Sequence, residues 1–133
     1  MRKINWATAL TRLILDNMDR PFEWGKFDCC LFAADAVQLI TGQDYAAPFR
    51  GTYTTQLGAA RSLKRYGAGT IQATLNAQLG PPHEVGYLSD GDLCLVETDQ
   101  GDTAAIFQSN AIWTPGPTGL LPIHTPPKAV WRL

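Results

Sequence analysis

The sequence predicts a single α+β domain over residues 1–133, with helices in the N-terminal half packed on an antiparallel β-sheet in the C-terminal half. Two patterns predict this class. Apolar residues recur at helical spacing before the double proline Pro81-Pro82, and short strand-like runs separated by Gly, Asp and Pro follow it. At 133 residues, with 45% hydrophobic and 17% charged residues, the chain is long enough for one hydrophobic core and cramped for two.

The first helix is predicted within residues 1–20. Its apolar stripe recurs at helical spacing, and most of its charged residues fall on other faces. The stripe consists of Trp6, Leu10, Leu13, Ile14 and Asn17. Pro21 disfavours a helical residue before it, so the helix should end near residues 18–20. The basic start is also typical of a signal peptide, but Asn5 and Arg12 interrupt any apolar core and no small-residue cleavage site follows.

A second, buried helix should begin after Asp28, which is a good N-cap residue. The apolar residues that follow are spaced at i, i+3, i+4, i+7, i+8 and i+11. They are Cys29, Phe32, Ala33, Ala36, Val37 and Ile40. Gly42 is a natural C-cap, so this helix should end there.

Two more helices are predicted in the middle of the chain, roughly over residues 55–66 and 70–79. The Gly-Ala-Gly run at residues 67–69 separates them. Small alanine-rich faces in both segments allow close packing.

Five strands are predicted after residue 90, joined by turns rich in Asp, Gly and Pro. Their expected ranges are 92–97, 104–108, 111–114, 120–123 and 129–132. In the first of them Leu93 and Leu95 face one side, while Cys94 and Val96 face the other. Both faces should therefore be buried, as in a central strand.

The charge and hydropathy of the chain exclude several classes of function. Eleven basic and twelve acidic residues give a net charge of -1, so nothing favours nucleic acid or anionic lipid. No stretch approaches the roughly 18 apolar residues of a membrane span. Three cysteines without a signal peptide predict reduced thiols, and their spacing to two distant histidines lacks a zinc pattern. No metal or other cofactor is expected.

Two of the three cysteines are adjacent, and Cys29 is the candidate nucleophile. As the first residue of a helix, it would lie where free N–H groups and the helix dipole stabilise a thiolate and lower its pKa. Cys30 is rotated by about 100° around the helix and should pack inward. The alternative is that both are buried structural cysteines, because free Cys is among the most buried residue types.

The surrounding motifs carry a family resemblance. Trp24-Gly25 is followed by Phe27-Asp28-Cys29 at a helix start and by Gly91-Asp92-Leu93 at a strand start. This order resembles the NlpC-type branch of papain-like cysteine peptidases, whose signature is Tyr-x-Trp-Gly-Gly, Phe-Asp-Cys-Ser-Gly and, later, Gly-Asp-Leu before His-Val-Gly-Ile. Residues 20–36, with Arg50-Gly51-x-Tyr53, most resemble a small set encoded among tail genes of phages and gene-transfer agents.

The resemblance implies a papain-like fold in which Cys29 attacks an amide carbonyl of a cell-wall peptide, with a histidine as base. Trp24, Asp28, Cys30 and Asp92 would then be structural residues near the site.

Several residues depart from the family pattern. The family histidine corresponds to Thr103 or Ala104, and neither side chain accepts a proton near neutral pH. Phe22 stands where the family usually has a tyrosine, and Cys30-Leu31 replace Ser-Gly. These differences predict a papain-like scaffold whose catalytic activity is weak or lost.

Another histidine could still serve as base, because triad partners need be adjacent only in space. His83, in the Pro-Pro-His-Glu-Val loop, and His124, near the last strand, are the two candidates. Glu84 or Asp102 could orient one of them. A lone loop histidine is, however, more often solvated than catalytic.

Two functions therefore remain, both implied by the resemblance and neither needing a cofactor. The preferred one is a phage tail-tip or baseplate component, made in the host cytoplasm and carried in the virion. It would bind other tail or hub proteins with weak or lost catalysis. The alternative is a working cysteine peptidase that cleaves peptidoglycan stem peptides during DNA entry, with Cys29 and a displaced histidine.

Overall fold

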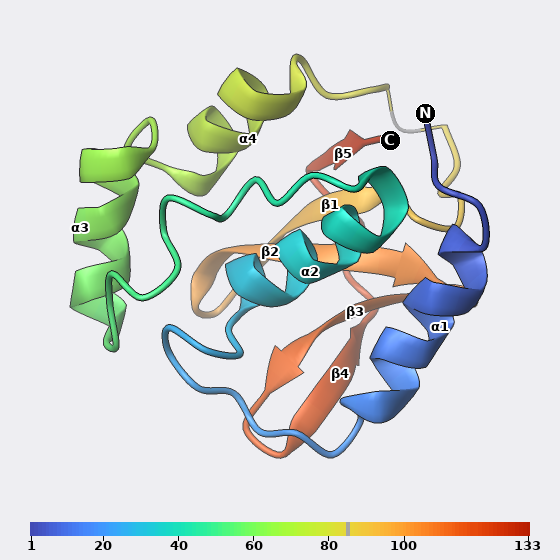
Figure 1. Cartoon of the computed structure of the whole chain (residues 1–133), viewed down its shortest axis with the longest axis horizontal. Helices are drawn as coiled ribbons and strands as arrows, with labels where there is room; N and C mark the ends of the chain where they lie inside the picture. The colour runs from blue at the N-terminus through green and yellow to red at the C-terminus, as the bar shows by residue number, and fades with distance from the viewer. Residues whose placement is uncertain (85) are drawn as a thin grey trace.

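The structure of the chain is a computed structural model that describes residues 1–84 and 86–133. The predicted α+β class is confirmed: four helices precede a five-stranded antiparallel sheet, and all the strands lie in the C-terminal half (Figure 1). In the described part of the chain, no helix has both the length and the apolar character needed to cross a membrane.

The helices begin and end close to the predicted positions. They are α1 (Trp6–Asp16), α2 (Cys29–Thr41), α3 (Gln56–Tyr66) and α4 (Ile71–Leu79). Three of them have a side chain that caps the first turn by accepting a backbone N–H: Asp28 for α2, Thr55 for α3 and Thr70 for α4. Gly42 ends α2 with a φ of 86°, which is the left-handed conformation expected of a C-cap glycine.

The sheet has the strand order β4-β3-β2-β1-β5, and every pair is antiparallel. The strands are β1 (Leu93–Thr98), β2 (Gly101–Gln108), β3 (Ala111–Gly116), β4 (Gly119–Ile123) and β5 (Ala129–Trp131). The strand expected to be central, β1, is paired on both sides, although β2 is the middle strand of the five.

The core has two parts because both faces of β1 are buried, as predicted. Leu93 and Leu95 pack with α1 and α2 on one face of the sheet. Cys94 and Val96 belong to a smaller cluster on the opposite face. Helix α2 crosses the first face over β2 (Figure 1). The first residues of α2 are therefore held against the sheet.

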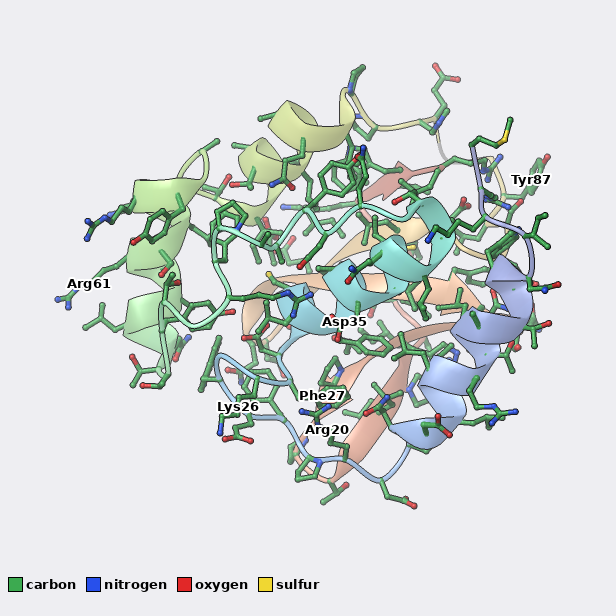
Figure 2. The ribbon with its side chains drawn as sticks, viewed as in Figure 1. Arg20, Lys26, Phe27, Asp35, Arg61 and Tyr87 are labelled. Carbon is green, nitrogen blue, oxygen red and sulfur yellow. The ribbon has the colours of Figure 1, made fainter. Side chains whose placement is uncertain are left out.

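Helices α3 and α4 lie to one side of α2, at the left and top of Figure 1. Arg61 projects from α3 away from the rest of the molecule (Figure 2), and Lys64 and Arg65 are also exposed. The partly buried apolar residues of α4 that pack against the main core are Ile71, Leu75 and Leu79. The charged face of this helix pair is thus in solvent.

Candidate functional site

The turn before α2 is organised around the carboxylate of Asp28, which is only 1% exposed. Its Oδ1 accepts the N–H of Leu31 at 2.9 Å, and its Oδ2 accepts the N–H of Gly25 at 3.0 Å. The hydroxyl of Tyr53 also donates to Oδ2, at 2.6 Å. One buried side chain therefore joins the turn at residue 25, the first turn of α2 and the loop that precedes α3, and so fixes the position of Cys29.

Gly25 has a geometric reason to be glycine. Its φ is 80°, and a Cβ atom added to it would lie 2.1 Å from the carbonyl oxygen of Tyr53. The Trp24-Gly25 pair of the motif thus lets two backbone segments approach closely beside the site. Burial and the hydrogen bond to Asp28 raise the pKa of Tyr53 far above its usual value, so the hydroxyl remains a donor.

Cys29 is the first residue of α2, and its side chain is half-buried, as is that of Cys30. Cys30 packs against the main core, as expected, but its thiol does not diverge from that of Cys29. The two Sγ atoms are 3.9 Å apart, which is within hydrogen-bonding distance for sulfur. The adjacent thiols are therefore one cluster rather than a nucleophile and a separate core residue.

Several groups set the pKa of Cys29, with a net lowering. The contact with the Cys30 thiol, which donates to Cys29 Sγ when Cys29 is ionised, has the largest effect and lowers this pKa. Burial opposes it, the backbone N–H of Ala104 lowers the pKa, and the charge of Asp28 raises it. The same thiol contact, together with burial, raises the pKa of Cys30 well above the ordinary thiol value. Cys29 therefore ionises first, while Cys30 keeps its proton.

Cys29 lies against β2 at Ala104, whose side chain belongs to the helix-facing core and is 2% exposed. The neighbouring Thr103 hydroxyl is 3.1 Å from that of Thr98 across the β1–β2 hairpin. Of the two residues at the position of the family histidine, Ala104 is thus the one that contacts Cys29.

Both thiols open into a cavity of about 870 Å³ between α2, α3, α4 and the sheet. Among the described residues that line it, the only charged ones are Asp28, Asp99 and Asp102, and none is lysine, arginine or histidine. Trp24 also lines the cavity and packs edge-to-face on Phe22, with ring centroids 4.8 Å apart. The site is consequently apolar and slightly acidic.

Neither candidate histidine lies at this cavity. The backbone N–H of His83 donates to the backbone carbonyl of Val130 at 2.8 Å, so His83 lies on the outer side of β5. At the usual strand spacing this is roughly 14 Å from β2, across three strand intervals. His124 is exposed and follows β4 at the other edge of the sheet.

Of the two residues proposed to orient a histidine, one does not line the cavity and the other already forms an ion pair. Glu84 is exposed, and Asp102 binds Lys128 Nζ at 2.8 Å. Val85, the last residue of the loop motif that contains His83, lies outside the described residues.

Asp92 occupies a different part of the molecule from Cys29. It is fully buried, and Arg132 donates to it through Nε at 3.0 Å and Nη2 at 2.8 Å. The adjacent Gly91 lies against Ile40, near the C-terminal end of α2. That end is about 16 Å along the helix axis from Cys29. Asp92 therefore anchors the C-terminus and is not beside the thiols.

A family model described as a domain of unknown function (DUF6950) matches residues 1–133. The chain belongs to the DUF6950 family. A search of curated proteins gives no match.

In this DUF6950 domain the described residues supply a nucleophile but not the acid that amide cleavage needs. A thiolate can attack a carbonyl, but an amine leaving group must be protonated as it departs. Cys30 is a poor donor to an amine because its own pKa is raised.

We expect iodoacetamide to label Cys29 with an apparent pKa below that of a free thiol, because Cys30 and Ala104 stabilise its thiolate. The rate against pH is read at the Cys29 peptide by mass spectrometry. His83→Ala and His124→Ala should leave this profile unchanged, since neither side chain lines the cavity. A profile that moves in either variant, or labelling only after unfolding, contradicts the described site.

Proposed function

We propose that this protein is a phage tail-tip or baseplate component that has a papain-like, NlpC-type scaffold and acts by binding, with weak or lost peptide hydrolysis. The scaffold assignment is supported by the place of the motif residues. Phe27-Asp28-Cys29 begins a buried helix that packs on an antiparallel sheet, which is the context that the resemblance implies.

One observation carries the loss of catalysis. The β2 residue in contact with Cys29 is Ala104, one of the two residues, with Thr103, that correspond to the histidine of the resembling family. A methyl group cannot take the thiol proton or return one to an amine. The cavity nevertheless persists beside Cys29, and its size is typical of a ligand site. A cavity of this size beside Cys29, with no histidine among its described lining residues, supports a binding role.

A cleavage assay tests this reading directly. Peptidoglycan stem peptides are incubated with the wild-type chain and with Cys29→Ser, and products are followed by liquid chromatography and mass spectrometry. We expect no cleavage above the buffer control in either sample. Cleavage by the wild type that Cys29→Ser abolishes would establish the alternative, a working cysteine peptidase, which the lowered pKa of Cys29 favours.

The tail assignment rests on the family resemblance and has a separate test. Phage particles are purified from a lysate of the bacterium that encodes the chain, and their proteins are identified by mass spectrometry. We expect the chain in tail-containing particles at a fixed ratio to the other tail proteins. Its absence from particles, with the chain remaining in the cell fraction, would contradict a virion role.

A further inference from the structure

We propose that Cys29 exchanges acyl groups with thioesters and that the cavity beside it binds the apolar acyl chain. This inference goes beyond the proposed function and does not depend on a tail location. It combines two features of the site, the paired thiols and the apolar cavity into which they open.

The cavity fits an uncharged, flexible chain. Its volume of about 870 Å³ lies within the range of small-molecule sites, which are mostly apolar with few polar groups. The wall between the helices is made of small and apolar side chains, including Ala33, Ala34, Phe49, Leu63, Ile71 and Leu75.

The charged side chains that line the cavity determine which part of a ligand can enter it. The charged residues among its described lining are all acidic, so a phosphate or a free carboxylate would be repelled. Asp28 is already satisfied by three donors, and Asp102 pairs with Lys128. An acyl chain can therefore occupy the cavity while an anionic carrier stays outside.

The thiols are placed to react with the carboxyl end of such a chain. Cys29 Sγ is beside the N–H of Ala104 and at the first turn of α2. The first N–H groups of an α-helix have no partner within the helix. The N–H of Leu31 is already bound by Asp28, but the backbone N–H of Cys29, at the first position of α2, can donate to the carbonyl oxygen as it gains negative charge during attack. Cys30 acts through Cys29 as a positioning residue, because its S–H can donate to the Cys29 sulfur once that sulfur is a thiolate.

The exchange balances without an acid or base. The Cys29 thiolate attacks the carbonyl carbon of an acyl thioester, a new C–S bond forms, and the C–S bond to the carrier breaks. The carrier leaves as a thiolate, so negative charge passes from one sulfur to another and no proton is consumed. An amine leaving group would require a proton. The step therefore needs only groups that the described site contains.

The test uses the reduced full-length chain with decanoyl-coenzyme A and, separately, acetyl-coenzyme A at equal concentration. Intact mass gives the number of acyl groups, peptide mapping locates them, and neutral hydroxylamine releases a thioester. We expect one acyl group on Cys29. Decanoyl transfer should be at least about tenfold faster than acetyl transfer, because each buried methylene contributes about 0.8 kcal/mol and about 1.4 kcal/mol gives tenfold.

Variants of the thiols separate the role of each sulfur. Cys29→Ser should lose the adduct. Cys30→Ala should slow transfer at neutral pH by about tenfold for each pKa unit by which Cys29 rises, moving the rate profile to higher pH. Cys30→Ser keeps a hydrogen-bond donor and should restore much of the rate. Cys94→Ser is the control, because Cys94 is buried on the opposite face of the sheet.

Filling the cavity tests the binding of the chain. Ala34 lies one turn after Cys30 and lines the cavity, so Ala34→Phe should slow decanoyl transfer far more than acetyl transfer. Ala47→Phe is a matched control, since Ala47 is exposed and is not among the cavity-lining residues. It should leave both rates unchanged.

Three results would overturn the proposal: no adduct with either thioester, equal rates for the two chain lengths, or modification of Cys94 as readily as of Cys29. None of them bears on stem-peptide cleavage, which is measured separately. Conversely, stem-peptide cleavage would contradict the proposed loss of hydrolysis without affecting acyl uptake. The two hypotheses can thus fail independently.

Discussion

Gly25→Ala is expected to lower the free energy of unfolding by about 3 kcal/mol, measured by urea unfolding monitored through tryptophan fluorescence. A positive φ alone costs an alanine about 1–2 kcal/mol. The added Cβ would also lie 2.1 Å from the backbone oxygen of Tyr53, which cannot rotate away as a side chain could. Relieving that contact moves the segment whose tyrosine hydroxyl binds Asp28.

Gly51→Ala provides a matched control for this substitution. Gly51 has a φ of 77°, close to the 80° of Gly25, but an added Cβ meets no atom within 4 Å. It should therefore cost only the backbone strain, about 1 kcal/mol. The difference between the two variants isolates the close approach to Tyr53. Equal destabilisation by both would show that the two segments are not in contact.

The helices and their ends are predictable from the sequence because their signals are local. Asp28 caps α2 through a bond to the residue three positions later, and Gly42 ends the helix by its own conformation. The alternation of Leu93 and Leu95 with Cys94 and Val96 likewise reports burial on both faces of β1. Each signal lies within a few residues of the feature it predicts.

The contacts that build the site are not local, and the sequence pattern does not contain them. The bond from Tyr53 to Asp28 spans 25 residues. Contact between Cys29 and Ala104 depends on how α2 lies across β2. Tyr53 belongs to the motif that resembles the phage set, which was the one available signal of its importance. Nothing in helical periodicity shows that its hydroxyl reaches Asp28.

Two errors of interpretation have specific physical causes. A rotation of about 100° between neighbouring residues suggests diverging thiols, but side-chain rotamers bring the sulfurs of Cys29 and Cys30 to 3.9 Å. Asp92 follows the nucleophile motif in the family signature, yet order in a signature does not give distance. In the fold, Asp92 starts a strand at the far end of α2 and binds Arg132.

Asp28→Ala is expected to destabilise the protein by about 3 kcal/mol, because three donors lose their acceptor in a buried site. Loss of the N-cap of α2 costs about 1 kcal/mol. The hydroxyl of Tyr53 and the N–H of Gly25 are then left without this partner, at about 1–3 kcal/mol for each buried donor that stays unsatisfied. Thr70→Ala, which removes the exposed cap of α4, should cost only about 1 kcal/mol.

A double-mutant cycle with Tyr53→Phe distinguishes the shared hydrogen bond from the helix cap. Tyr53→Phe alone should cost about 1 kcal/mol, since Asp28 keeps two backbone donors. In the double variant no hydroxyl remains to be stranded, so the combined loss should be smaller than the sum of the single losses. Additive losses would mean that the hydroxyl and the carboxylate act separately. The loop before α3 would then not be held to α2 through Asp28, and the wall of the cavity would need another support.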